Sequence, residues 1–457
     1  MQATTSILRI ATADEAPTPA RASGPRVLLL NPAVYDIRLP WAKWQQPVQL
    51  LQLGATLREK EDADVVLIDA MHHPRDERLR RERVAVLKID NQPSNKWRFG
   101  VSKREIENRL QALRSMGWSP DRIFVECFAT FWWEGAREAI EVARLVYPHS
   151  RVTLVGTYPA LATDHAKANA GADDVGFEPP VADCQSPLAY DLYPNQSGHA
   201  YITLDRGRRA AEDILDEIER RARRRAVQHF AFAEHGAAAV HLVLYRRILE
   251  GIIERGLKIG LYALGDISPS AIVAQPDLPS LMKRAGYKQT CFSDDRELVG
   301  DQSGTERRIH ECRIAALLCH EAGFRARTDD LVGSVCIGKP GESLSERAKA
   351  ATMTAHYLGS VILWPYQPEP RECTDIPLEA QNGKLFPFRH LNGATYRDYL
   401  GLLGLGTVLT AKYRTRTFDF LGEGFVPGLF RASLAREAWD PDPAVKGSLQ
   451  LPVLARR

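Results

Sequence analysis

Four short apolar runs, separated by longer stretches of helical periodicity, restrict the fold of this chain more than any other feature of its sequence. The runs span residues 26–31 (RVLLLN), 64–69 (DVVLID), 122–127 (RIFVEC) and 151–155 (RVTLV). A short, nearly continuous apolar run is typical of a strand that is buried on both faces of a parallel sheet. Strands that alternate with helices in this way predict an open parallel sheet with helices on both faces. We therefore expect a Rossmann-like α/β domain over residues 25–180.

The remaining elements of this domain follow from the same patterns. We expect helices at 47–59, 104–116, 135–147 and 165–170 and a short final strand at 173–176. In such sheets, ligands bind beyond the carboxyl ends of the strands, near the point where the strand order reverses. The loops at those ends span 31–44, 127–135 and 156–166 and are rich in aromatic, glycine and other small residues. No GxGxxG motif follows the first strand and there is no Walker A loop, so the loops predict a large flat ligand rather than a dinucleotide.

The second half of the chain repeats the alternation of strands and helices. We expect strands at 200–204, 229–232, 258–261, 290–292, 325–328, 333–337 and 360–364, and helices at 209–224, 240–255, near 278–285, at 308–322 and at 343–358. Repeated strand–helix units of this length predict a partial (β/α) barrel over residues 200–370. Residues 1–24 have the composition of a flexible leader, 181–199 that of a linker, and 371–457 that of a helical extension.

Charge and hydropathy exclude several classes of partner. The 60 basic and 57 acidic residues give a net charge of only +3, so neither a nucleic-acid partner nor a membrane partner is indicated. The most apolar late stretch, 399–411, is shorter than the roughly 20 residues that span a bilayer, and it predicts a buried helix. Because a secretory pattern is also missing, we expect a cytoplasmic protein. The seven cysteines are scattered without a CxxC pair, which predicts neither a disulfide framework nor a metal site.

The first domain resembles a known family. The segment NPAVYDIRLPWAKWQQPVQLLQLGATLREKEDADVVLIDAM, which begins at Asn31, resembles the opening of the cobalamin-binding domains of the cobalamin-dependent radical SAM superfamily. The later blocks KWRFGVSKREIENRL and CFATFWWEGAREAIEVARLVYPHSRVTLVGTYPALATDHAKANAGADDV are similar to one uncharacterised branch of that superfamily. The resemblance implies that cobalamin and its nucleotide tail are lined by Asn31, Pro32, Cys127, Phe128, Gly156, Thr157, Tyr158, Gly176 and Glu178. The same loops contribute Tyr35, Trp41, Thr130, Trp132 and Pro159 as further candidate contacts.

Each of these residues has an alternative role in a turn or in the core, and Asn31-Pro32 alone would be an ordinary strand-end turn. The DxHxxG motif, which supplies a histidine to cobalt in other cobalamin proteins, is absent. The resemblance therefore implies base-off cobalamin without a histidine ligand from the protein. His165 is a candidate acid–base group facing the corrin, and the alternative for it is a helix cap.

The second half resembles the same superfamily but lacks its cluster motif. Blocks such as AYITLDRG, HFAFAEH, CIGKPGES and LEAQNGKLFPF are similar, in order, to the radical SAM barrels of that branch. In the family, a CxxxCxxC loop opens directly after the first barrel strand and holds an iron–sulfur cluster. Here Arg206-Gly207 is followed by Arg208 and Arg209, and the cysteine loop is missing. We therefore expect no iron–sulfur cluster and no adenosyl-radical reaction, and binding of S-adenosylmethionine stays open.

The ends of the predicted barrel strands hold the catalytic candidates. Glu234 and His235 follow one strand and Asp266 follows another, although surface roles are equally compatible with these positions. Cys291 and Cys336 lie on strands and are expected to be inert packing thiols. The resemblance and these residues predict a cobalamin-dependent enzyme that transfers a methyl group by polar chemistry, with a small-molecule substrate. The alternative is a non-catalytic cobalamin-binding pseudoenzyme, a carrier or sensor with a protein partner.

Overall fold

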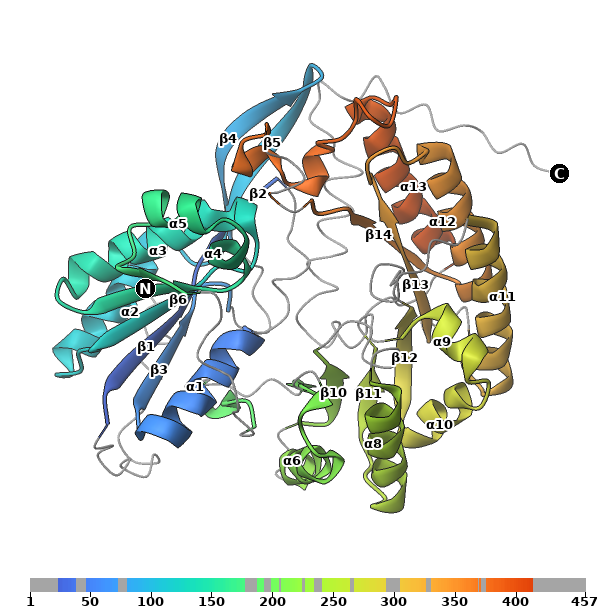
Figure 1. Cartoon of the computed structure of the whole chain (residues 1–457), viewed down its shortest axis with the longest axis horizontal. Coiled ribbons are helices and arrows are strands. Elements are labelled where there is room, and N and C mark those ends of the chain that lie inside the picture. Colours follow the sequence, from blue (N-terminus) through green and yellow to red (C-terminus); the bar gives the residue numbers. More distant parts are fainter. Residues whose placement is uncertain are drawn as a thin grey trace, which may run out of the picture.

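The computed structural model describes the chain in segments. The described residues are 24–37, 47–72, 80–176, 187–192, 199–204, 207–223, 227–233, 241–263, 267–292, 305–325, 330–368, 370 and 375–413. Within them the chain forms two parallel sheets and one small antiparallel sheet, connected and flanked by helices (Figure 1). The prediction of a mixed α/β protein with parallel sheets is therefore confirmed.

The first sheet has five parallel strands in the order β3-β1-β6-β7-β8. Its strands are β1 (Arg26–Asn31), β3 (Asp64–Asp69), β6 (Arg122–Glu126), β7 (Arg151–Val155) and β8 (Asp174–Val175). The side chains of β1 show why its run is apolar throughout. Val27 and Leu29 face one cluster of buried residues, and Leu28 and Leu30 face another, so that all four are fully buried. A strand covered on both faces has no position at which a polar side chain would reach water.

Helices cover both faces of this sheet, as predicted. They are α1 (Val48–Glu61), α2 (Lys103–Ser115), α3 (Trp133–Val146), α4 (Thr157–Leu161) and α5 (Thr163–Asn169). Leu50 and Leu53 of α1 belong to the cluster on one face, whereas Ile106 of α2 and Ile140 of α3 belong to the cluster on the other. The start of α2 is fixed by Ser102, whose hydroxyl accepts a hydrogen bond from the backbone N–H of Glu105 at 3.2 Å.

An antiparallel hairpin between β3 and α2 was not predicted. It consists of β4 (Arg81–Ile89) and β5 (Gln92–Phe99), and β2 (Val34–Asp36) completes a three-stranded sheet in the order β2-β5-β4. Asp90 and Asn91 form its turn with φ values of 47° and 61°. Positive φ at both central residues is the conformation of the type I′ turn, which suits the twist of a hairpin and favours asparagine and aspartate.

The second sheet has six parallel strands that follow chain order, β14-β13-β12-β11-β10-β9. Its strands are β9 (His199–Ile202), β10 (His229–Phe232), β11 (Gly260–Tyr262), β12 (Tyr287–Phe292), β13 (Leu331–Ile337) and β14 (Val361–Pro365). Its helices are α6 (Ala211–Arg223), α8 (Leu242–Glu254), α9 (Pro269–Ala274), α10 (Leu278–Ala285), α11 (Thr305–Glu321) and α12 (Leu344–Leu358). Of these, only α9 was not predicted. The strand predicted at 325–328 lies largely outside the described residues.

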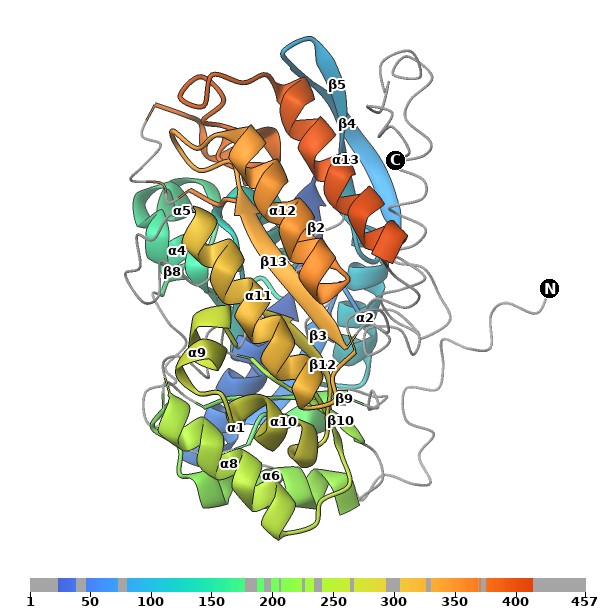
Figure 2. The ribbon, with the colours of Figure 1, turned by 90° about the vertical axis from the view of Figure 1, so that its right-hand side faces the viewer.

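We call the first sheet with its helices the first unit, and the second sheet with its helices the second unit. The helices of the second unit lie on the side of its sheet that faces away from the first sheet (Figures 1 and 2). Consecutive right-handed strand–helix–strand units place their helices on one face when the strands follow chain order. A Cβ atom added to Gly333 would lie 2.2 Å from a Thr354 methyl group of α12, so Gly333 allows this helix to approach the sheet closely. The opposite face of the sheet is turned toward the first unit (Figure 1).

The C-terminal segment bridges the two units. It contains η6 (Leu378–Ala380), η7 (Gly383–Leu385) and α13 (Tyr396–Tyr413), and α13 packs on α12 and β14 through a cluster that includes Tyr399 and Phe386. The rings of Phe386 and Tyr399 stack with their centroids 4.5 Å apart.

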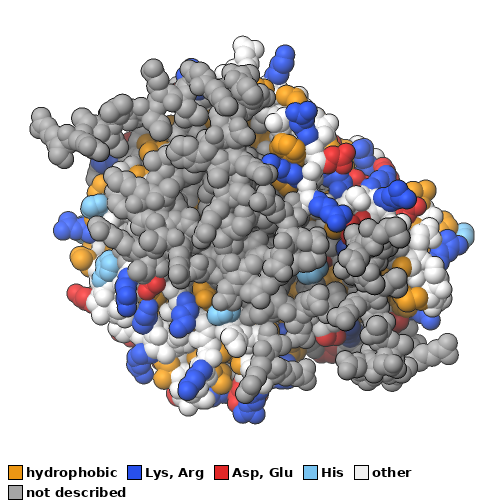
Figure 3. All heavy atoms as spheres, turned by 180° about the vertical axis from the view of Figure 1, so that it is seen from behind, with side chains coloured by type: hydrophobic (Ala, Val, Ile, Leu, Met, Phe, Trp, Pro, Cys, Tyr) orange, Lys and Arg blue, Asp and Glu red, His pale blue; other side chains and the backbone are white. Residues whose placement is uncertain are grey.

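Among the helices of the described residues, none combines the length and apolar character of a membrane span. Basic and acidic side chains are interspersed over the described surface of the face in Figure 3.

Candidate functional site

The strand order of the first sheet places a switch point between β1 and β6. Numbered along the chain, the strand order is 2-1-3-4-5. The chain passes from β1 to β3 on one side and from β6 to β7 on the other, so the connections leave β1 and β6 in opposite directions. The carboxyl edge beside such a point is where ligands bind in open parallel sheets. Asn31 ends β1, and Cys127 directly follows β6, so both predicted residues lie at this edge.

One part of the edge is polar. The Asn31 side-chain amide donates to Oδ1 of Asp69 at 2.6 Å, and the backbone N–H of Met71 donates to the same oxygen at 2.9 Å. Asn31 and Asp69 are both buried. His72 lies three residues after Asp69 and is half-buried. Burial lowers the pKa of His72, although the negative charge of Asp69 acts in the opposite direction. Asp69 and His72 were not predicted as site residues. Their signal was the DVVLIDAMHH sequence at a strand end.

Gly156 was expected to line the cobalamin, but the need for a glycine at this position arises within the fold. Its φ is 104° and its ψ is −168°, a combination that residues with a Cβ rarely adopt. A Cβ atom at this position would lie 2.7 Å from the carbonyl oxygen of Cys127. The same oxygen accepts a hydrogen bond from the N–H of Tyr158 at 3.0 Å. Gly156 therefore allows β6 and the start of α4 to meet, and this contact occupies the space that a Cβ would need.

Three aromatic side chains meet beside this contact. The hydroxyl of Tyr158 lies 2.8 Å from Nδ1 of His165, and the Trp133 ring meets His165 edge to face at 5.1 Å between centroids. Tyr158 is fully buried, and burial raises its pKa. A tyrosine hydroxyl that keeps its proton can donate to Nδ1 or accept from an Nδ1–H, so the tautomer of His165 sets the direction of this hydrogen bond. The alternative prediction for His165 was a helix cap. In the structure its ring instead bonds the Tyr158 hydroxyl, and His165 lies inside α5.

The remaining candidates divide into accessible and buried residues. Phe128 is 43% exposed, and Thr157 and Gly176 are half-buried, so these three are accessible at the strand ends. Leu161, which was not predicted, is a second exposed apolar side chain, at 44%, and it is the last residue of α4 after β7. The buried candidates are Pro32, Cys127, Thr130, Trp132, Tyr158 and Pro159. The exposed apolar side chains at this edge suit contact with an apolar ligand or surface.

Trp132 and Tyr35 hold parts of the protein together. The Trp132 indole N–H donates to Oδ2 of Asp36 at 2.9 Å, and Trp132 is 5% exposed. Oδ1 of Asp36 accepts from the Asn382 amide at 2.9 Å, and the Lys384 ammonium pairs with Oδ2. We call Asp36, Trp132, Asn382 and Lys384 the Asp36 clasp, because they join the first unit to the C-terminal segment.

Tyr35 points toward α3. Its hydroxyl donates to Glu138 at 2.8 Å, and the Arg98 guanidinium binds the same carboxylate through two nitrogens. Burial, followed by the charge of Glu138, raises the pKa of Tyr35. These contacts attach the antiparallel sheet to α3, and they commit the polar group of Tyr35 within the protein.

Five predicted site residues lie outside the described residues. They are Trp41, Glu178, Glu234, His235 and Asp266. Their predicted roles stay predictions.

The turn after β9, where the resembling family has its cluster loop, carries a buried ion network instead. Arg209 donates to Glu217 at 2.7 Å and to the carbonyl oxygen of Thr203 at 3.0 Å, and Arg221 donates to the other oxygen of Glu217 at 3.0 Å. The side chains of Arg209 and Glu217 are only 3% and 1% exposed. Guanidinium groups at this turn do not fit an iron–sulfur cluster, whose ligands are thiolates.

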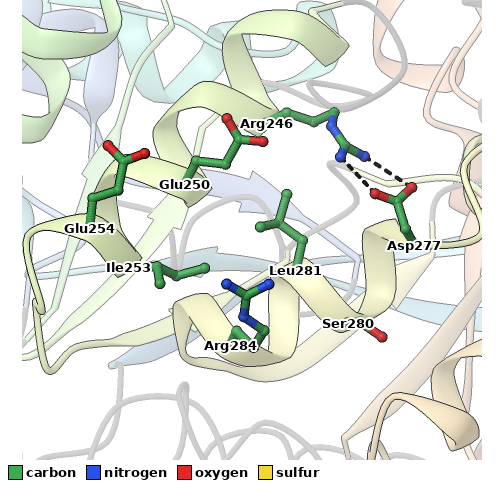
Figure 4. A pocket seen from close by; sticks show the side chains of 8 residues that line it. All are labelled: Arg246, Glu250, Ile253, Glu254, Asp277, Ser280, Leu281 and Arg284. Carbon is green, nitrogen blue, oxygen red and sulfur yellow. Dashed lines mark hydrogen bonds and ion pairs between the residues drawn. The ribbon is translucent and has the colours of Figure 1, made fainter.

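A separate pocket lies on the outer surface between α8 and α10. It has a volume of about 340 Å³ and is lined by Arg246, Glu250, Ile253, Glu254, Asp277, Ser280, Leu281 and Arg284. Figure 4 shows Arg246 and Asp277 paired at one end. This pocket contains none of the predicted site residues.

Comparisons with known proteins add little. No protein-family model matches the sequence, and no curated protein matches it. Among solved structures, the chain is similar to the crystal structure of an alpha-amylase from Lactobacillus plantarum, with a TM-score of 0.21 and 11% identity over 68% of this chain and 76% of the amylase chain. A likeness of this size supports no inference about fold or activity.

Proposed function

We propose that the first unit binds cobalamin in the base-off form at the carboxyl edge of β1 and β6. The sequence resemblance is the basis of the ligand's identity. The observation that carries its location is the switch point in the order β3-β1-β6-β7-β8, which lies beside Asn31 and Cys127.

The described residues at this edge are compatible with a flat, largely apolar macrocycle. Phe128 exposes apolar surface there, and Thr157 and Gly176 are half-buried residues just after β7 and β8. Asn31 and Asp69 tie the ends of β1 and β3 together, which holds the edge in a fixed shape.

We further propose that the protein is an enzyme whose second unit is a partial (β/α) barrel that presents a small-molecule substrate to the cofactor. Cobalamin, when bound, carries a methyl group between a donor and an acceptor. The face of the second sheet without helices is turned toward the first unit, so a substrate on that face would lie between them (Figure 1). Glu234, His235 and Asp266 remain the proposed acid–base groups.

The ion network at the turn after β9 suits any protein without a cluster, which includes a second candidate, a non-catalytic cobalamin carrier or sensor. Arg209 and Glu217 stabilise that turn as a structural element, which a protein without radical chemistry would retain. The two candidates share the cofactor site and differ in whether a substrate is converted. A carrier would deliver or report the corrinoid through a protein partner.

Cobalamin binding is tested by the visible spectrum of the protein after mixing with hydroxocobalamin and desalting. We expect about one corrinoid per chain with the base-off spectrum. Phe128→Asp should abolish retention, because it places a carboxylate on the apolar edge. Val243→Asp is the matched control, since Val243 is 85% exposed on α8 and lies on the second unit. Complete loss of the corrinoid from the unmodified protein, or equal loss from both variants, contradicts the proposal.

Catalysis is tested by loss of methyl from bound methylcobalamin in the dark, with acceptors supplied from a cell extract. An enzyme should show acceptor-dependent demethylation, and Glu234→Gln should slow it at least about tenfold, which corresponds to about 1.4 kcal/mol in the barrier. Corrinoid retention should not change in this variant. Stable methylcobalamin with every acceptor would identify the carrier.

A further inference from the structure

The pocket between α8 and α10 has a lining that the proposed function does not use. Its volume of about 340 Å³ falls within the range of about 300–1,000 Å³ that is typical of small-molecule sites. α8 supplies four of the eight lining residues, and α10 with its N-cap Asp277 supplies the other four. The pocket therefore has two walls that come from two packed helices.

The base of the pocket is apolar. Leu281 is 7% exposed and belongs to a core cluster, and the half-buried Ile253 packs against the same cluster. Ile253 lies three residues after Glu250 on α8, and Leu281 lies three residues before Arg284 on α10. Residues at this spacing are neighbours on one helix face. In the view of Figure 4, the Leu281 side chain lies between the Glu250 carboxylate and the Arg284 guanidinium.

Three of the five charged groups in the lining are committed to ion pairs. Arg246 donates to the two carboxylate oxygens of Asp277 at 3.1 and 2.6 Å, and this pair lies at one end of the pocket (Figure 4). The hydrogen bond from Arg246 holds the pKa of Asp277 below its usual range. Glu254 accepts a hydrogen bond from Arg247, which lies outside the lining, at 3.1 Å.

Glu250 and Arg284 are the charged groups that remain. Glu250 on α8 is half-buried and Arg284 on α10 is exposed, and neither has an ion-pair partner in the described part of the chain. Arg246 acts on Glu250 only through its charge, because its hydrogen bonds go to Asp277. The two opposite charges thus line one pocket from facing helices without pairing with each other.

A ligand that carries both charges would satisfy both groups at once. Arg284 can donate two parallel hydrogen bonds to a carboxylate, and Glu250 can accept hydrogen bonds from an ammonium group. The lining holds three carboxylates and two guanidinium groups, so it suits a zwitterion better than a simple anion. Arg284 in turn opposes a simple cation.

We propose that this pocket binds a free amino acid with an apolar side chain. Its carboxylate would meet Arg284, its ammonium group would meet Glu250, and its side chain would lie on Ile253 and Leu281. The proposal goes beyond the proposed function and does not depend on cobalamin, because the pocket contains none of the residues assigned to the cofactor.

The test is isothermal titration calorimetry of the full chain, without cobalamin, with L-leucine and L-phenylalanine as probes. We expect saturable binding of at least one of them. The N-acetyl derivative of that amino acid lacks the ammonium group and its amide lacks the carboxylate, so each should bind at least about tenfold more weakly. Glu250→Gln and Arg284→Gln should each raise the Kd of the amino acid at least about tenfold.

The derivatives and the variants together identify which group meets which charge. In Glu250→Gln, acetylation of the ligand should cost little further affinity, because the partner of the ammonium group is already lost. In Arg284→Gln, acetylation should still weaken binding.

Two matched controls test whether the effects belong to the pocket. Glu107→Gln on α2 removes a half-buried carboxylate, and Arg313→Gln on α11 removes an exposed guanidinium, and neither residue lines the pocket. Both controls should leave the Kd unchanged. No saturable binding of either amino acid would overturn the proposal, and so would equal affinity for the N-acetyl derivative or equal weakening in the controls. Should a pocket variant fail to fold, the derivatives still test the proposal on the unmodified chain.

Discussion

The Asp36 clasp makes a quantitative prediction about the connection between the two units. The Asp36 side chain is fully buried and the Lys384 side chain is 10% exposed, so their ion pair has little access to water. Asp36→Asn keeps the shape of the side chain and removes its charge, which leaves the Lys384 ammonium buried without a counter-charge. Breaking a buried pair in this way costs about 3–5 kcal/mol of stability.

The reverse substitution removes the other partner of the same pair. In Lys384→Met, the Asp36 carboxylate still accepts hydrogen bonds from the N–H of Ile37, from Trp132 and from Asn382, but it is left buried without a counter-charge. We therefore expect Lys384→Met to cost about 3–5 kcal/mol as well. The double variant Asp36→Asn/Lys384→Met buries no net charge at this position, so it should recover much of the loss seen in Asp36→Asn alone.

Urea denaturation of all four proteins provides the measurement, with tryptophan fluorescence as one probe and far-UV circular dichroism as the other. Trp132 donates to Asp36, so the clasp contributes to the fluorescence signal, which sums over the eight tryptophans of the chain. Two probes are needed because a chain with two units need not unfold in one step. A cost of less than about 1 kcal/mol for Asp36→Asn, or a double variant no more stable than it, would show that the ion pair is not what stabilises this junction.

Three further predictions concern single sites. Gly156→Ala should destabilise the chain by about 2–4 kcal/mol in the same urea assay, because of the positive φ and the close contact with Cys127. Gly256 also has a positive φ but has open space around it, so Gly256→Ala should cost about 1 kcal/mol. Equal costs for the two variants would contradict the role of the Cys127 contact. Burial lowers the pKa of His72, so protonation favours the unfolded chain and stability should fall as the pH drops through about 6.5, the unfolded value. His72→Gln should reduce that fall between pH 7.5 and 5.5, and an unchanged pH profile would refute it. Burial raises the pKa of the Cys312 thiol and of the Cys319 thiol to about 12, so both should react with a thiol reagent at pH 8 only after denaturant is added, and rapid labelling of the native protein would refute this.

The sequence predicted the parallel sheets because their signal is local. A strand such as β1, buried on both faces, requires an apolar residue at every position, and the run 26–31 displays that requirement directly. The helix α10 was predicted at 278–285 because its apolar positions and the glycine that follows are also local features. Elements of this kind carry their evidence within a window of a few residues.

The hairpin was missed for a physical reason. Most of β4 is exposed, so its sequence shows no buried face, and its main sign is the Asp90-Asn91 pair at the turn. The clasp could not be foreseen, because Asp36 and Lys384 are 348 positions apart and no local pattern in the blocks that contain them links the two. The part of the candidate site that the sequence predicted, the ends of β1 and β6, is the part that strand position determines. Whether a loop aromatic such as Trp132 faces a ligand or a buried aspartate depends on such long-range contacts.

The clasp also has a consequence for the birth of the protein on the ribosome. Asp36 leaves the ribosome early, whereas its partners Asn382 and Lys384 follow 346 and 348 residues later. At about 5–20 residues per second, the delay is on the order of 20–70 seconds. Throughout that interval Asp36 and the Trp132 indole lack these partners, and the clasp can close only after residues 382 and 384 have been made. Docking of the first unit on the C-terminal segment is thereby tied to the synthesis of that segment.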